Sequence, residues 1–406
     1  MSVATVSADN RRAGSPFEIL LVFLRLGFSS FGGPIAHIGY FRREFVVRRR
    51  WIDEQSFADL VGLCQFLPGP ASSQVGFAIG LMRAGFIGAL AAWTGFTAPS
   101  AIALVLFAYG AHALQNSMGI AVLHGLSLFA IAIVAQAAWG MARALCPDWQ
   151  RASIAIGAAL AIAFSTSPLS QVAVIACGGI LGLLLCRAVP AAVVHRLVVP
   201  VSRGVAVCAL IAFFGILLGL PALRVSSASS AVSLFEAFYR SGALVFGGGH
   251  VVLPLLREAF VAPGWVSEDR FLAGYGAAQA IPGPLFTFAA YLGTVVSPSP
   301  HGIAGAAMGL AGIFLPGILI LIGTLPFWDS LRHRAGAQAL MRGVNAAVVG
   351  LLGAALVSLV TSGTVHDWRD AGLALGGFLL LVLFRLPPVA VVLGTIAAAV
   401  AISMGA

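Results

Sequence analysis

The sequence contains no lysine, and all 23 of its basic residues are arginine, against 14 acidic residues. Charged residues make up only 9% of its 406 residues, hydrophobic residues make up 60%, and the mean hydropathy is +1.00. A water-soluble chain of this length and composition would expose very large apolar patches. The scarcity of charge therefore argues against a soluble domain and indicates an integral membrane protein whose solvent is a lipid bilayer.

The chain also lacks the motifs of common soluble enzymes and metal centres. It has no C-x-x-C pair among its five cysteines, no H-E-x-x-H, no Walker loop and no G-x-S-x-G. We therefore expect no catalytic residue, no cofactor and no metal. The only basic cluster, within 42–50, is typical of a juxtamembrane loop, so we expect no nucleic acid partner. The first fifteen residues are polar and lack the apolar core of a secretory signal, so we expect no cleavage.

Several apolar stretches are long enough to cross a bilayer, which takes about twenty helical residues. The predicted spans are 85–113, 120–141, 170–186, 204–220, 302–328, 339–360 and 373–400, with a shorter one at 152–164. The span at 373–400 is long enough for two crossings separated at 385–388. The chain is therefore predicted to be an all-α, multi-pass protein of the inner (cytoplasmic) cell membrane.

An internal repeat appears when the chain is laid over itself at an offset of about 215 residues. FLRLGFSSFGGP from Phe23 matches FYRSGALVFGGG from Phe238, and both copies continue through a tryptophan (Trp51, Trp265) to a shared Pro-Gly-Pro. The repeat divides the chain into a polar tail (1–16), a first repeat (17–187), a joining segment with one helix (188–221) and a second repeat (222–406).

These paired blocks resemble the chromate ion transporter family in its long form, which has two fused homologous domains. The resemblance covers essentially the whole chain, and its specific part is the FGG and PGP blocks with the tryptophan between them. It implies proton- or potential-coupled movement of chromate, with sulfate as a further substrate, usually as resistance by export. The second copy departs from the first at Gly249 and His250, so the two copies need not be chemically equal.

The arginines predict how the two copies are oriented, because short cytoplasmic loops carry an excess of positive charge. If 17–50 and 55–83 are each a hairpin of two half-helices, then the arginines at 11–12, 42–50 and 83 lie on the cytoplasmic side together. The joining helix then starts the second copy from the opposite face. We therefore predict two inverted homologous halves with broken or re-entrant helices, a frequent construction of secondary transporters, whose sites lie near the membrane midplane.

The FGG blocks interrupt apolar sequence where a continuous helix would otherwise be expected. Broken backbone at membrane depth is tolerated where it is buried in protein or lines a cavity. A helix that restarts after the break directs free N–H groups at an anion. The alternative is that the glycines only allow close helix packing. The candidate residues are Gly32, Gly33, Pro34, Gly247, Gly248, Gly249 and His250.

The PGP blocks give a second set of candidates by the same reasoning. Hydroxyls in the turn that follows could donate to an oxyanion, or could bond back to their own helix. Two glutamines, three residues before each block, could bind substrate or connect helices. The candidates are Gln65, Pro68, Gly69, Pro70, Ser72 and Ser73 in the first copy, and Gln279, Pro282, Gly283, Pro284 and Thr287 in the second.

Arg25 and Arg240 occupy matching positions in the apolar half-helix before each FGG block. An arginine within a membrane indicates a functional site, and its planar guanidinium matches a tetrahedral oxyanion. The alternatives are extension to the interface or pairing with an acid such as Glu18 or Glu236.

These features together predict a secondary transporter that exports chromate and confers chromate resistance. The alternatives are a carrier of sulfate or another oxyanion, an embedded enzyme acting on a phosphate-bearing lipid, and a membrane scaffold. The enzyme lacks a nucleophile or an acid and base pair at a defensible spacing, and a scaffold does not explain the paired breaks. The expected partners are a small oxyanion and the lipid bilayer, and the sequence leaves a homo-oligomer open.

The arginine hypothesis predicts that Arg25→Gln or Arg240→Gln abolishes chromate efflux from loaded vesicles, because each change removes a charge that would bind the anion. Membrane insertion of each variant, checked by fractionation, should be unchanged. Efflux retained in both variants would remove these residues from the site.

Overall fold

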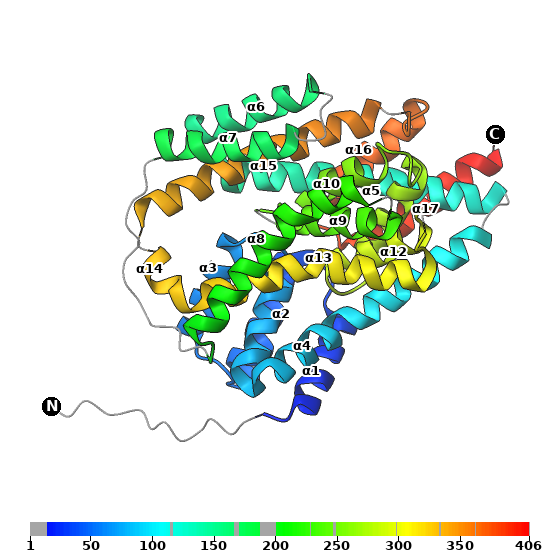
Figure 1. Ribbon diagram of the computed structural model, residues 1–406. Coiled ribbons are helices and arrows are strands. Elements are labelled where there is room, and N and C mark those ends of the chain that lie inside the picture. The colour runs from blue at the N-terminus through cyan, green and yellow to red at the C-terminus, as the bar shows by residue number, and fades with distance from the viewer. Residues whose placement is uncertain are drawn as a thin grey trace.

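The computed structural model describes residues 14–113, 117–165, 170–186, 200–227, 229–246, 249–297, 299–332, 334–361 and 363–405. Every regular element in these residues is helical, as the sequence predicts. Five helices are long and apolar enough to cross a membrane. The chain is therefore a multi-pass, all-α membrane protein (Figure 1).

The described residues of the first repeat form seven α-helices and a π-helical turn. They are α1 (Pro16–Ser29), α2 (Gly33–Phe41), η1 (Arg42–Arg48), α3 (Glu54–Phe66), α4 (Ala71–Ala113), α5 (Ser117–Leu145), α6 (Trp149–Ala163) and α7 (Ser170–Leu185). The joining helix is α8 (Arg203–Ser226). Only 17% of its most apolar window is buried, which leaves most of this helix available to lipid.

The second repeat follows the same order with more interruptions. Its elements are α9 (Ser230–Ala243), η2 (Gly249–Val251), α10 (Val252–Phe260), α11 (Glu268–Ala280), η3 (Leu285–Thr287), α12 (Phe288–Val295), α13 (Gly302–Thr324), η4 (Leu325–Phe327), α14 (Trp328–Arg332), α15 (Ala335–Thr361), α16 (Trp368–Val382) and α17 (Pro388–Gly405). The stretch predicted to hold two spans is indeed two helices, α16 and α17, separated at 383–387.

Both glycine- and proline-rich blocks of the first copy break the helices into hairpins. α1 ends at Ser29, and Gly32 and Gly33 have φ values of 96° and 76°, in the left-handed region that favours glycine. The chain then runs back toward the start of α1, as an ion pair of 2.8 Å between Arg49, after η1, and Glu18 of α1 shows. The start of α1 also meets the end of the next hairpin, where the Gly14 N–H donates to the Arg83 carbonyl over 3.1 Å. The predicted hairpins are therefore present.

Helix α4 is not a single rod but folds back on itself. As one rod its 43 residues would be about 65 Å long, roughly twice the hydrocarbon thickness of a bilayer. Ala84 and Gly85 leave helical geometry, and the two arms then pack so closely that a Cβ atom on Gly80 or Gly88 would overlap the carbonyl oxygen of the other. The sequence places the span start at residue 85, where this fold-back occurs.

The second copy repeats this arrangement. Ser230, at the start of α9, donates its hydroxyl to the Ser299 carbonyl after α12, and the Ser297 N–H donates to the Trp265 carbonyl over 3.0 Å. Gly293 of α12 and Gly305 of α13 then contact each other as Gly80 and Gly88 do. The equivalent contacts at equivalent positions show two homologous halves.

The halves exchange helices rather than lying side by side. Helices α6 and α7 of the first half pack against α15 of the second, and α16 and α17 of the second half pack against α5 of the first (Figure 1). Small residues allow the close approach: Gly178 and Gly182 of α7 contact Gly343 of α15, and Gly125 of α5 contacts Ile396 of α17. Neither half therefore encloses its own core.

The glycine contacts predict a strong position dependence of stability. Gly305→Ala places a Cβ atom against the Gly293 carbonyl, where backbone must shift, and should cost about 1–3 kcal/mol or more. Gly110→Ala, at a helical position with open space around it, is the matched control and should leave stability nearly unchanged. The measurement is the thermal unfolding midpoint in detergent, and equal midpoints for both variants would contradict the packing.

Candidate functional site

The breaks of the two halves meet through a pair of reciprocal hydrogen bonds. The Gly69 N–H of one PGP block donates to the Val245 carbonyl over 2.8 Å, and the Gly283 N–H of the other donates to the Ser30 carbonyl over 3.0 Å. Ser30 and Val245 are equivalent positions of the repeat, and so are Gly69 and Gly283. Each half donates one of these hydrogen bonds and accepts the other through equivalent residues, so the contact has two-fold pseudo-symmetry. We call this region the crossing.

Further contacts extend the crossing with the same symmetry. The Gln74 side-chain amide donates to the carbonyls of Pro68 and Gly317, at 2.9 Å each, and so connects the first PGP block to α13. Gly283 packs against Ser100, which is the repeat equivalent of Gly317. Both PGP glycines have positive φ, 115° at Gly69 and 108° at Gly283, so the close approach of backbone here favours glycine.

His37 connects the first break to the helix that follows the first PGP block. Its ring nitrogens lie 3.3 Å from the Ser72 hydroxyl and 3.2 Å from the Ser30 carbonyl, and its ring packs edge-on against Phe96. The side chain is 1% exposed. On the other side, Pro34 contacts Gly249, which brings the two FGG blocks together.

Several buried polar atoms around the crossing have no hydrogen-bond partner in the described part of the chain. They are Ser30 Oγ, Ser73 Oγ, Gln74 Oε1 and Thr97 Oγ1. A buried hydroxyl or amide without a partner costs about 1–3 kcal/mol, and such groups are uncommon in folded proteins. These four side chains are uncharged and belong to segments that contact one another at the crossing.

The structure brings together most of the residues predicted from the PGP blocks. Pro68, Gly69, Pro70, Ser72 and Ser73 lie at the crossing and are buried or nearly so. On the other copy Pro282, Gly283 and Pro284 lie there as well, whereas the Thr287 hydroxyl donates to the Pro284 carbonyl over 2.7 Å. The hydroxyl of Thr287 thus bonds back to its own turn.

The two predicted glutamines differ from each other. Gln65 is exposed, and Gln279 is half-buried and hydrogen-bonds Tyr275 on its own helix. The glutamine at the crossing is Gln74, four residues after the first PGP block, together with Ser30 and Thr97. In the sequence, Ser30 could have been found from its position directly before a helix break. No sequence pattern pointed to Gln74 or Thr97.

The two predicted arginines lie in unlike surroundings. Arg240 donates from Nε to Glu236 over 2.7 Å, and Glu236 also accepts a hydrogen bond from Arg224 over 3.2 Å. Arg240 therefore has the acidic partner that was the alternative to binding an anion. Arg25 is exposed and lines a cavity of about 210 Å³ with Arg43, Arg48 and Tyr40. That cavity shares no lining residue with the crossing, and the acid Glu18 pairs with Arg49 instead.

Three predicted residues of the second FGG block lie wholly or partly outside the described structure. Gly247 and Gly248 lie outside the described residues, and of His250 only the backbone, in η2, is described. Gly249 lies against Pro34 and Leu285, and Gly32 and Gly33 form the turn of the first break.

Comparisons with known proteins agree with this duplicated architecture. The profile of the chromate transporter family matches residues 17–183 and again 232–402. A chromate transport protein of Pseudomonas aeruginosa is 30% identical over 353 residues, which is 84% of this chain and 80% of the relative. One of Cupriavidus metallidurans is 27% identical over 377 residues, or 91% and 88%. No solved structure matches. The chain belongs to the chromate transporter family.

Proposed function

We propose that the protein exports chromate across the cytoplasmic membrane through an anion site at the crossing, and thereby confers chromate resistance. The observation that carries the proposal is the group of unpaired buried hydroxyls of Ser30, Ser73 and Thr97, where both halves meet. The membership in a transporter family favours transport over catalysis.

The chemistry of the crossing suits a tetrahedral oxyanion. Ser30, Ser73 and Thr97 offer hydroxyl donors, and α4 begins at Ala71 directly after the first PGP block. The first N–H groups of a helix have no partner within that helix and carry a positive partial charge. Neutral donors and a helix terminus hold an anion without a fixed counter-charge, so the bound anion can also leave.

Arg25, Arg43 and Arg48 supply positive charge at a separate place. Their cavity is lined by residues of α1, α2 and η1, the two arms of the first hairpin, and Glu44 in its lining is paired with Arg48 and Arg49. Because guanidinium groups bind oxyanions and remain charged at physiological pH, this cavity serves as the approach to the crossing from the arginine-rich face.

The two-fold pseudo-symmetry supports alternating access. If the symmetry axis lies in the membrane plane, as the arginine distribution predicts, the crossing lies near the midplane and each half presents the same break to opposite faces. An inside-negative potential favours the outward movement of a dianion by roughly 2.3 kcal/mol per charge per 100 mV. Export of chromate therefore needs no obligatory cation.

Removing hydroxyls at the crossing should reduce transport without reducing stability. Ser73→Ala and Thr97→Val each delete a hydroxyl that has no hydrogen-bond partner among the described residues, so the unfolding midpoint should stay the same or rise. We expect chromate efflux from loaded proteoliposomes to fall about tenfold or more, as for the loss of roughly 1.4 kcal/mol of binding. Ser153→Ala, on exposed α6 surface, is the control. Unchanged efflux in both variants would move the site away from the crossing.

Cells that produce the protein should tolerate more chromate and accumulate less of it than cells that produce the Ser73→Ala variant. Sulfate uptake, measured in the same cells, distinguishes the substrate, because the two dianions have the same shape. Higher sulfate uptake with unchanged chromate tolerance would contradict chromate export and indicate sulfate import instead.

A further inference from the structure

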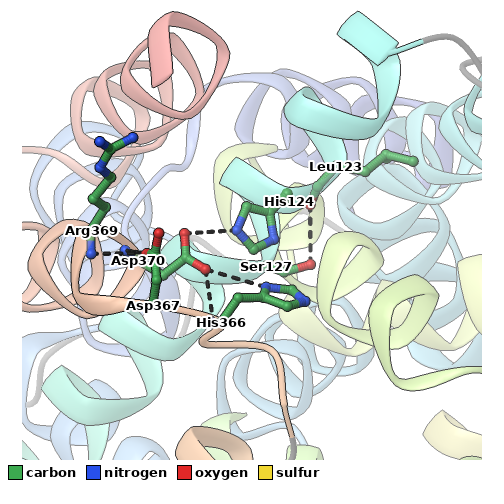
Figure 2. A network of polar contacts seen from close by, with 7 residues as sticks. All are labelled: Leu123, His124, Ser127, His366, Asp367, Arg369 and Asp370. Atoms are coloured by element: carbon green, nitrogen blue, oxygen red, sulfur yellow. Dashed lines mark hydrogen bonds and ion pairs between the residues drawn. The ribbon is translucent and has the colours of Figure 1, made fainter. Parts of the chain in front are cut away.

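A second polar cluster lies far along the chain from the breaks, where α5 meets the start of α16 (Figure 2). His124 Nε2 lies 2.9 Å from Asp370 Oδ1, and His366 Nδ1 lies 3.3 Å from Asp370 Oδ2. One potential ligand atom from each residue lies within 4.8 Å of the others. The carboxylate of Asp370 thus lies between two imidazoles that come from separate segments.

The backbone around this cluster is firmly held. Asp367 caps α16 by accepting the N–H groups of Arg369 and Asp370 at 2.9 Å each, which fixes the turn that carries Asp370 (Figure 2). Asp370 itself accepts the His366 N–H over 2.9 Å. On the opposite helix, Gly125 next to His124 packs against α17. Ligands on rigid elements keep their geometry without a bound ion.

The set of ligand atoms suits a zinc-like ion. Two imidazole nitrogens and one carboxylate oxygen are ligands that Zn²⁺ takes in tetrahedral sites with bonds of about 2.0–2.2 Å. In such a site the ligand atoms lie about 3.3 Å from one another. The two histidines contact different oxygens of Asp370, at 2.9 and 3.3 Å, and one ligand atom from each residue lies within 4.8 Å of the others. Side-chain rotations therefore suffice to bring the three ligand atoms around one ion.

A fourth ligand position would face open space. His124 and His366 line a cavity of about 1270 Å³, which also includes Ser127, Arg270 and His301. His366 is 68% exposed, so an ion can reach the site from this cavity. Three protein ligands with one open position is the arrangement in which zinc keeps a water or an exchangeable ligand.

The equivalent place in the other half lacks these ligands. Asp148 caps α6 as Asp367 caps α16, and each is followed by a tryptophan. Arg151 takes the position of Asp370, and Arg342, beside Gly343, takes the position of His124 beside Gly125. The Arg151 hydrogen bonds lower the pKa of Asp148, so an internal ion pair replaces the cluster there. The histidines and the carboxylate are therefore a special feature of one side of a duplicated structure.

We propose that His124, His366 and Asp370 form a binding site for one divalent transition-metal ion of the zinc type. The ion joins α5 of the first half to α16 of the second, at the wall of the large cavity. The site is distinct from the crossing, and its occupancy does not depend on which anion the protein carries.

The test uses the full-length protein, purified in detergent with an affinity tag that contains no histidine. After dialysis against Zn²⁺ or Mg²⁺, we expect one zinc per chain and no retained magnesium, since these nitrogen-containing ligands suit zinc better. X-ray absorption should show two imidazoles on the zinc. His366→Ala and His124→Ala should each weaken zinc binding at least about tenfold, measured by titration calorimetry, because even ligand-orienting groups contribute that much.

His301→Ala is the matched control, since His301 lines the same cavity but is not part of the cluster. Its zinc affinity should equal that of the unmodified chain. His366 is largely exposed, so its replacement leaves the fold intact and the measurement interpretable. Absence of bound zinc, or equal affinity in the His366→Ala, His124→Ala and His301→Ala variants, would overturn the proposal and leave a hydrogen-bonded contact between two helices.

Discussion

Helix breaks buried in a membrane protein must find hydrogen-bond partners for their amide and carbonyl groups, because lipid supplies none. In this chain each half supplies the partner that the other half needs: Gly69 binds Val245, and Gly283 binds Ser30. The two breaks therefore stabilise each other, in addition to the hydrogen bonds that each receives within its own half. The location of the crossing and the contact of equivalent residues follow from this requirement.

The exchange of helices between the halves has the same consequence on a larger scale. Because α5 is covered by α16 and α17, and α15 by α6 and α7, the fold closes only when both copies are present. Glycines at Gly178, Gly182 and Gly343 let the exchanged helices approach to backbone contact. In lipid, where apolar side chains gain little from meeting each other, close packing of this kind is a main source of helix association.

Duplication allows the two copies to diverge wherever packing does not require equality. Both PGP blocks have glycine at the crossing because this residue has a positive φ and lies close to the other half of the chain. Elsewhere the copies differ: Arg25 lies in a basic cavity, whereas Arg240 is held by Glu236. The contrast between His124 with Asp370 and Arg342 with Arg151 is of the same kind. The two copies thus share the same helix arrangement, and their charged and polar side chains differ.

The sequence by itself determined the membrane class, the duplication and the positions of the breaks. Each rests on local physics: apolar runs, repeated blocks, and glycine or proline where a helix cannot continue. It also placed the start of a span at residue 85, where α4 folds back, and the separation of α16 from α17. These features need no knowledge of which segments touch.

Only the tertiary structure decided which polar groups meet. Ser30, Gln74 and Thr97 join the crossing because helices more than two hundred residues apart pack there, as the Gln74 bond to Gly317 shows. The same holds for His124 and Asp370. Arg240 faces an acid on its own helix, and Arg25 faces other arginines, although both occupy the same position of the repeat. Side-chain partners depend on packing between distant segments, and the pattern of a single chain does not encode that packing locally.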